Sequence, residues 1–226
     1  MNLVAIETAT SACAVAVRTR GGDEFIRVFD EERRHNEVLS EAIAQLLDEA
    51  AIGVREVDRV IVDRGPGLYT GLRVGLATAI ALAQGIGADL VAVTSLETLA
   101  WGAFSAGVRG RLVACVDARR GEIFTQLFEL GDGAEQNSAP RVARARNVVI
   151  EWATNGAPVT FSGDGVERYL SDFAAVPNGV IHHQAVPSIR AALSMGARRV
   201  VEGAVVPLYL READAVANFT TRERPQ

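Results

Sequence analysis

One loop, Asp63-Arg64-Gly65-Pro66-Gly67-Leu68-Tyr69-Thr70-Gly71-Leu72-Arg73, joins a short apolar stretch to a long one. The residues before it, 59–62, are predicted to form a buried strand, and the residues after it, 72–84, a helix that is apolar or small on nearly every side. The glycines permit the backbone angles of a tight turn, and Thr70 stands where a side chain can cap a helix. A strand, a turn and a helix in this order indicate an α/β fold.

The sequence on either side of the loop extends this pattern. Short β-rich runs at 3–6, 12–17 and 24–29, separated by turn residues, predict a meander of three antiparallel strands. From Asn36 to Ala51 the apolar residues recur at the spacing of a helix face. A strand at 90–93 and a helix from Ser95 toward Ala106 follow. The first half therefore predicts a mixed sheet flanked by helices.

The second half repeats the opening of the first, which indicates two lobes. The turn-forming glycines at positions 107 and 110 favour a boundary between lobes. We therefore expect a first lobe over 1–108 and a smaller second lobe over 109–226. The expected elements of the second lobe are strands at 112–116, 123–130 and 159–162, helices at 147–153, 166–173 and 188–202, and an extended segment at 207–211 before a loosely held tail.

Composition excludes several classes of protein. The chain of 226 residues carries a formal net charge of -5, so it has no overall positive field to attract nucleic acid. All 23 basic residues are Arg, which removes Lys-based catalysis and the phosphate-binding Lys of a P-loop. The chain opens without a basic leader, and no apolar run reaches membrane-spanning length. We therefore expect a cytoplasmic protein with no membrane contact.

The glycine loop has two interpretations, which the sequence leaves open. Backbone amides at the start of a helix can hold an anion or a nucleotide phosphate. The residues that would form such a site are Arg64, Gly65, Gly67, Thr70, Gly71 and Arg73. Without a Gly-Lys-Ser/Thr sequence, a tight turn that simply needs glycine backbone angles explains the loop equally well.

Metal and nucleophile chemistry find no support in the sequence. One helical turn after His35 the residue is Leu39, and the adjacent His182 and His183 would point to opposite sides of a strand. Cys13 and Cys115 lie in apolar runs, which predicts buried free thiols. We therefore predict no metal site and no catalytic residue.

The two helices of the first half are predicted to form a partner surface, because the second is apolar on too many sides for one lobe to cover. Small residues along it would allow another helix to approach closely. The residues assigned to this interface are Val38, Leu39, Ala42, Leu46, Leu72, Gly75, Ala79 and Ala83.

Four blocks of sequence resemble the TsaB (YeaZ) family. They are Ile6-Glu7-Thr8-Ala9-Thr10, Gly65-Pro66-Gly67-Leu68-Tyr69-Thr70-Gly71-Leu72-Arg73-Val74-Gly75, Asp117-Ala118-Arg119-Arg120-Gly121-Glu122-Ile123-Phe124 and Pro207-Leu208-Tyr209-Leu210-Arg211. The family more often has Asp at the position of Glu7. The resemblance implies an actin-like ATPase (ASKHA, ribonuclease H-like) fold, in which hairpins such as those at 7–10 and 117–121 face a nucleotide.

The resemblance also implies a function in making threonylcarbamoyladenosine on tRNA. In that family TsaB is a scaffold and activating subunit without activity of its own, and the catalytic partner is its paralogue TsaD. An ATPase subunit, TsaE, joins them, and tRNA would be reached only through the complex. No cofactor is expected on the lone chain, whereas ATP or ADP with magnesium is expected in the assembled complex. Three alternatives stay open: an ATPase that acts alone, a peptidase of the partner subunit, and a homodimer in place of a monomer when the chain is isolated.

Overall fold

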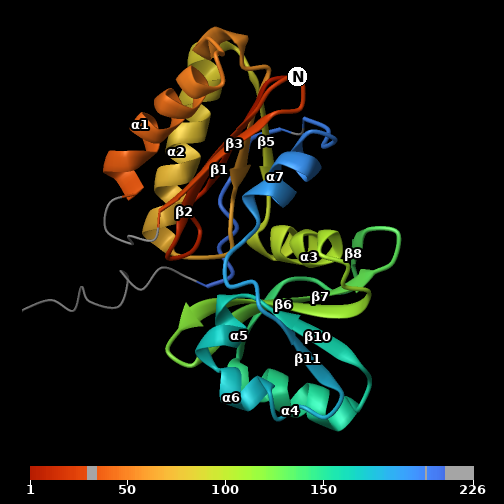
Figure 1. The fold of residues 1–226 in the computed structure, drawn as a ribbon. Helices are drawn as coiled ribbons and strands as arrows, with labels where there is room; N and C mark the ends of the chain where they lie inside the picture. The colour runs from red at the N-terminus through yellow and green to blue at the C-terminus, as the bar shows by residue number, and fades with distance from the viewer. Residues whose placement is uncertain (30–34, 202, 212–226) are drawn as a thin grey trace, which may run out of the picture.

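The computed structural model describes residues 1–29, 35–201 and 203–211, and Figure 1 shows them as two lobes, one above the other. The predicted tail lies outside these residues after position 211. The first lobe contains β1 (Leu3–Glu7), β2 (Cys13–Arg18), β3 (Glu24–Phe29), α1 (His35–Glu49), the short 3-10 helix η1 (Val54–Glu56), β4 (Arg59–Asp63), α2 (Tyr69–Ile86) and β5 (Asp89–Val93). The remaining elements are α3 (Ser95–Ser105), β6 (Gly110–Arg119), β7 (Glu122–Leu130), β8 (Ala134–Gln136), β9 (Arg141–Arg144), α4 (Ala145–Asn155), β10 (Val159–Ser162), α5 (Asp164–Arg168), α6 (Leu170–Phe173), β11 (Gly179–His182) and α7 (Ile189–Gly196).

The two sheets share one topology, which confirms the predicted repeat. The first sheet has the order β3-β2-β1-β4-β5, and the second has β8-β7-β6-β10-β11 with β9 also paired to β7. In each sheet the first two strands are antiparallel, and the strand that follows the first crossover pairs parallel to the first strand. The strand pairs β1–β4 and β6–β10 are therefore equivalent positions in the two lobes.

The lobes exchange helices. α3 precedes position 108 in the sequence, yet its Leu96, Leu99 and Ala103 pack into the core formed by β6 and β7. α7 comes late in the sequence and packs back onto the first sheet, where Ile189 and Leu193 join its core. A cut of the chain at 108 would thus separate each of these helices from the sheet that it covers.

The first sheet is covered on both faces, as Figure 1 shows with α1 and α2 on one side and α7 on the other. The α1 and α2 side is aliphatic, with Leu39, Leu46, Val60, Val62 and Ala79 among its fully buried residues. Burial on both faces explains why β1 and β4 are apolar at nearly every position rather than alternating.

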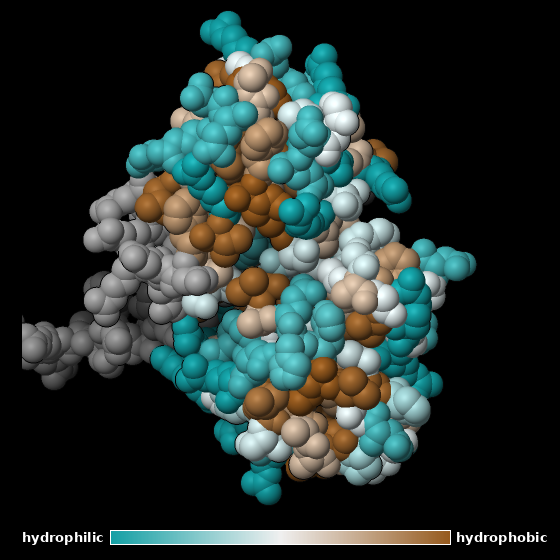
Figure 2. Space-filling model, in the orientation of Figure 1, coloured by the Kyte–Doolittle hydropathy of each residue, from teal (hydrophilic) through white to brown (hydrophobic). Residues whose placement is uncertain are grey.

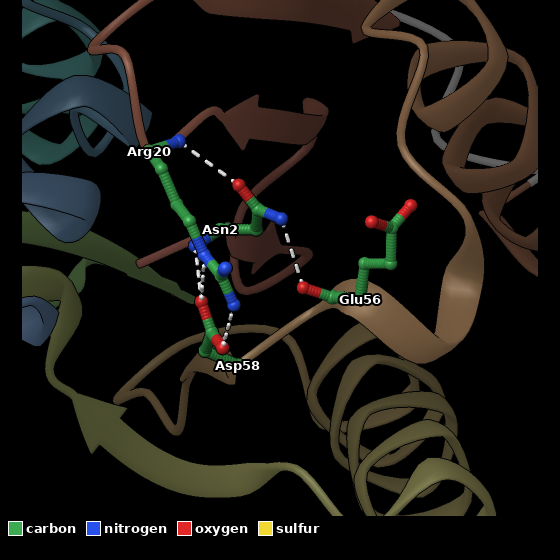
Figure 3. A network of polar contacts seen from close by, with 4 residues as sticks. All are labelled: Asn2, Arg20, Glu56 and Asp58. Atoms are coloured by element: carbon green, nitrogen blue, oxygen red, sulfur yellow. Dashed lines mark hydrogen bonds and ion pairs between the residues drawn. The ribbon is translucent and has the colours of Figure 1, made fainter.

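A polar network of Asn2, Arg20, Glu56 and Asp58 lies at the start of β1 (Figure 3), at the end of the first lobe away from the second lobe in Figure 1. The backbone N–H of Asn2 donates to Asp58 Oδ2 at 2.6 Å, and its side chain donates to the Glu56 carbonyl at 2.9 Å. Arg20 donates to both carboxylate oxygens of Asp58, at 3.2 and 2.8 Å. The hydrogen bonds from Arg20 lower the pKa of Asp58. This network ties the start of β1 to the turn after β2 and to the segment before β4.

Three sequence predictions need correction. The helix predicted over 188–202 ends at Gly196. The guanidinium of Arg59 donates to the carbonyls of Gly196, Ala197 and Arg199, which satisfies carbonyl groups that a helix leaves without a partner at its end. The helix predicted over 166–173 is divided into α5 and α6 at Tyr169, whose backbone is not helical. β8, β9 and β11 were not predicted, since they have only three or four residues each.

Thr70 is not the cap of α2. The cap is Leu68, because its backbone N–H donates to the Ala9 carbonyl at 2.6 Å and its backbone is extended. The helix therefore begins at Tyr69, and Thr70 lies exposed in the first turn. None of the described helices is long and apolar enough to span a lipid bilayer.

Candidate functional site

The two hairpins that the sequence singled out face each other across a small cavity between the lobes. The cavity has a volume of about 230 Å³ and is lined by Ala9, Thr10, Ser11, Leu68, Val116, Asp117, Arg119, Asp164 and Arg168. Ligand pockets that enclose a molecule of drug or nucleotide size usually measure about 300–1,000 Å³. This cleft could enclose a small ion, but its volume is below that range.

The glycine loop packs directly onto the first hairpin. A Cβ added at Gly67 would lie 2.0 Å from the Ala9 carbonyl oxygen, and one added at Gly75 would lie 2.1 Å from Thr8 Oγ1. The Thr8 hydroxyl donates to the Gly71 carbonyl at 2.8 Å. The glycines therefore serve a close approach of two segments of the same chain, which agrees with the tight-turn interpretation.

Two backbone N–H groups of the glycine loop, which the anion interpretation would need, already donate within the chain. The N–H of Gly65, whose φ is +99°, donates to Asp63 Oδ1 at 2.7 Å, and the N–H of Leu68 donates to Ala9. Arg64 and Arg73 are not among the residues that line the cavity. Arg73 instead stacks on the ring of Tyr69 at 4.3 Å and donates to the Tyr209 hydroxyl at 3.4 Å.

Four carboxyl groups stand at equivalent ends of the central strands of the two sheets. In the first lobe Glu7 ends β1 and Asp63 ends β4, while in the second lobe Asp117 lies near the end of β6 and Asp164 follows β10. The Asp117 N–H donates to Asp164 Oδ1 at 2.8 Å, and Arg119 and Arg168 each approach Asp117 Oδ2 to 3.5 Å. Glu7 and Asp117 lie in the two hairpins at 7–10 and 117–121, whereas Asp63 and Asp164 were not predicted as site residues, although the repeat of the strands could have revealed them.

Burial raises the pKa of three of these acids. Asp63 is 1% exposed, and burial raises its pKa to about 7 despite hydrogen bonds from Gly65 and Ser95. Burial, followed by the charge of Asp63, raises the pKa of Glu7 well above its ordinary value. Burial also raises the pKa of Asp164 to about 6. Glu7 and Asp63 are thus held away from water, whereas Asp164 lines the cavity, where the charge of Arg119 partly offsets the effect of burial on its pKa.

Replacing Asp63 is expected to change how stability depends on pH. The folded chain holds the Asp63 proton more tightly than the unfolded chain, so the free energy of unfolding should fall as pH rises from 3.8 to about 7. The loss should be of the order of 2–4 kcal/mol. Asp63→Asn keeps an oxygen that can accept from Gly65 and should reduce this slope. Urea unfolding of both proteins at pH 5, 7 and 8 measures it, and equal slopes would contradict the burial argument.

Possible metal ligands and the two cysteine thiols decide which further chemistry the described residues can perform. The described residues contain no group of three or more His, Cys, Asp or Glu side chains arranged to hold a metal ion. Cys13 and Cys115 are buried free thiols, as predicted, and burial raises the pKa of each to about 12. A thiol with such a pKa is almost wholly protonated at neutral pH and is a poor nucleophile.

A second, larger concavity lies between α1 and α2. It has a volume of about 850 Å³ and is lined by Ser40, Ile43, Ala44, Leu47, Asp48, Ile52, Val54, Ala77, Thr78, Ala81 and Leu82. We call it the α1–α2 groove. Its surface is largely aliphatic, and Val54 at its edge is 44% exposed. On the face drawn in Figure 2, hydrophobic side chains also gather over the strands of the first lobe.

The residues assigned to the partner interface point to the other side of these helices. Leu39, Ala42, Leu46, Leu72, Gly75, Ala79 and Ala83 are buried within the first lobe, and Val38 is half-buried. None of these eight residues lines the α1–α2 groove. An interface on these two helices would therefore be made by the groove residues.

The duplicated sheets, the facing hairpins and the acids at equivalent strand ends define an α/β protein with an actin-like ATPase fold. A Bacteroides thetaiotaomicron protein with an actin-like ATPase fold superposes with a TM-score of 0.50 at 11% identity, over 86% of this chain and 95% of that one. A crystal structure of a Pseudomonas aeruginosa protein, described as similar to peptidase YEAZ, superposes with a TM-score of 0.80 at 26% identity, over 93% and 99%. The predicted fold is thereby confirmed.

Sequence comparison places the chain within this class. Residues 30–222 match the family described as "TsaD: tRNA N6-adenosine threonylcarbamoyltransferase", and the chain belongs to that family, with the relatives named TsaB (YeaZ). The Bacillus subtilis protein TsaB is 27% identical over 99% of this chain and 100% of its own length. The Haemophilus influenzae protein TsaB is 33% identical over 55% of this chain, and that match spans 52% of the relative's length. Both are described as tRNA threonylcarbamoyladenosine biosynthesis proteins.

Proposed function

We propose that this chain takes part in tRNA threonylcarbamoyladenosine biosynthesis as a non-catalytic, activating subunit that pairs with a TsaD-like paralogue. The names of its relatives and the family match support the pathway. In this proposal a TsaE-like ATPase joins the pair in the cytoplasm. The assembly, rather than this chain alone, binds tRNA and ATP or ADP with magnesium.

The observation that carries the proposed pairing is the α1–α2 groove. Two helices whose inner sides are already buried leave an aliphatic concavity open to solvent, with small residues at Ala44, Ala77 and Ala81. Small residues let the backbone of another helix come close, and an apolar centre is typical of a lasting interface. A paralogue of the same fold offers an equivalent pair of helices, which would complete a four-helix packing.

The small cavity between the lobes supports the non-catalytic part of the proposal. Its volume of about 230 Å³ is small for a nucleotide. Glu7 and Asp63 are buried acids with raised pKa values rather than open metal ligands. The glycine loop donates two of its N–H groups to its own chain. A peptidase function is disfavoured because both thiols are buried and protonated.

The test combines association with activity. Purified chain is mixed with the TsaD-like paralogue of the same organism and analysed by mass-resolved chromatography. We expect a complex of one copy of each, and threonylcarbamoylated tRNA only when the paralogue and the ATPase subunit are also present. Titration calorimetry should detect no MgATP binding by the lone chain. Modification of tRNA by this chain alone, or the absence of any complex, would overturn the proposal.

The same chromatography decides between a homodimer and a monomer. If a second copy of this chain binds the groove, the isolated protein elutes as a dimer, and the paralogue must displace one copy. A standard interface buries about 800 Å² on each partner, which is large enough for either association to be measurable.

A further inference from the structure

A third cavity lies on the opposite face of the first sheet from the α1–α2 groove, next to the start of α7. It has a volume of about 420 Å³ and is lined by Glu7, Thr10, Ala12, Ala14, Ile26, Val28, Gln184, Val186, Pro187, Ser188, Ile189 and Arg190. We call it the α7 pocket. It shares only Thr10 with the lining of the interlobe cavity. Its volume is within the range of about 300–1,000 Å³ that is usual for small-molecule sites.

The pocket exists because α7 covers only part of the sheet. Ile189 and Leu193 pack over Leu3, Ala5 and neighbouring residues, and the helix ends after eight residues. Toward the carboxyl end of β1 the sheet presents small side chains, Ala12 and Ala14, which leave the space unfilled. Val28 on the edge strand β3 is 54% exposed and stands among the lining residues.

The walls of the pocket are held in place by contacts with α3, by the cap of α7 and by an ion pair to β3. Gln184 lies against α3, where a Cβ added at Gly102 would meet its side-chain oxygen at 2.6 Å. The Ser188 hydroxyl accepts from the Ala191 N–H at 3.2 Å and caps α7. Arg190 pairs with Glu24 of β3 across the structure. The pocket is therefore preformed rather than dependent on a moving segment.

Two polar residues of its lining, Glu7 and Thr10, have incomplete hydrogen bonding. Glu7 is 3% exposed and Thr10 is 1% exposed, and within the described residues Glu7 Oε2 and Thr10 Oγ1 have no hydrogen-bond partner. The other Glu7 oxygen accepts from the Ala9 N–H at 2.6 Å, and the backbone of Thr10 also bonds to the Glu7 carboxyl. Buried polar atoms normally have partners, so two such oxygens in the lining of one pocket call for a donor from outside the chain.

The charge around Glu7 defines what that donor should be. Burial is the largest cause of the raised pKa of Glu7, and the charges of Asp63 and Asp164 near its carboxyl raise this pKa further. An anionic ligand would be repelled by them. A cationic N–H donor would supply both the missing hydrogen bonds and the missing positive charge.

We propose that the α7 pocket binds a small primary ammonium compound, whose charged head donates to Glu7 and Thr10 and whose apolar part lies against Ala12, Ala14 and Ile26. The ammonium group can belong to a simple amine or to an amino acid, since the guanidinium of Arg190 stands at the same pocket and can donate to a carboxylate. This site is separate from the partner groove and goes beyond the proposed function.

The test uses the isolated, full-length, ¹⁵N-labelled chain at neutral pH. Backbone amide shifts are followed by NMR during titration with isoamylamine, with isoamyl alcohol as the neutral match and isovalerate as the anionic match. We expect saturable shifts at Ala12, Ala14 and Ile189 with the amine, and at least 10-fold weaker binding of the other two. Leucine distinguishes the sources: tighter binding than the amine assigns the site to amino acids, and weaker binding assigns it to simple amines.

Two variants complete the test. Glu7→Gln should weaken amine binding about 10-fold while it leaves the alcohol unchanged, because only the charge is removed. Val28→Trp replaces an already exposed residue, so it should fold normally and block binding of all ligands. Equal binding of amine and alcohol, shifts that persist in Val28→Trp, or no saturable shift with any probe would overturn the proposal. None of these results depends on TsaD or on tRNA modification.

Discussion

Gly67→Ala is expected to lower the free energy of unfolding by about 3 kcal/mol or more. The added Cβ would lie 2.0 Å from the Ala9 carbonyl oxygen and 2.8 Å from the Ala9 carbonyl carbon. Both are backbone atoms, so the clash cannot be relieved by turning a side chain. The glycine loop and the first hairpin must separate, which also breaks the Leu68 to Ala9 hydrogen bond.

Gly85→Ala is the matched control. Gly85 lies exposed inside α2, and a Cβ there meets nothing within 4 Å. Because Ala favours a helix interior over Gly, this variant should be more stable than the starting protein by about 0.5–1 kcal/mol. Urea unfolding followed by circular dichroism compares the two. If Gly67→Ala is as stable as Gly85→Ala, the loop does not need its close approach to Ala9.

The sequence predicted most of the fold because each long element has one strong periodic signal. α2 was expected over 72–84 and occupies Tyr69–Ile86, and the strand before it was expected over 59–62 and occupies Arg59–Asp63. The repeat of the hairpins was predicted from local pattern alone. The exchange of α3 and α7 between lobes was not, since it depends on contacts between residues far apart in the chain.

The helix faces show the limit of periodicity. Ala79 and Ala81 are both small residues of one apolar helix, and the sequence gives no reason to place one inside and the other outside. In the structure Ala79 is fully buried against the first sheet, whereas Ala81 is exposed in the α1–α2 groove. The side of such a helix that packs on the sheet is decided by the connection between the strands on either side of it. A local sequence pattern does not contain that information.

The acids of the site show a different limit. Asp63 could have been found from the sequence, because it ends a buried strand and precedes the glycine loop. Its raised pKa could not, since this depends on how deeply the fold buries the carboxyl and on the nearby charge of Glu97. A pKa shift of this kind can be predicted only when the distances between the charged groups are known, and those distances follow from the fold.

The buried position of Ala79 also changes how the partner surface must be tested. An Arg at Ala79 would bury an unpaired charge in the core of the first lobe and disrupt folding, so loss of association would carry no information about an interface. The test therefore belongs on the exposed side of α2, where a large charged residue can be added without entering the core.

Ala81→Arg is expected to weaken association with the TsaD-like paralogue at least 100-fold, which corresponds to about 2.7 kcal/mol. The guanidinium would lie within the aliphatic groove, where a partner would have to bury it without a counter-charge. The free energy of unfolding of the lone chain should change by less than about 0.5 kcal/mol, because Ala81 is exposed in the isolated chain. Ile150→Arg, which adds the same charge at an apolar residue of α4 that is 52% exposed, should bind as the starting protein does. Titration calorimetry measures all three proteins, and normal binding by Ala81→Arg would move the partner surface away from the α1–α2 groove.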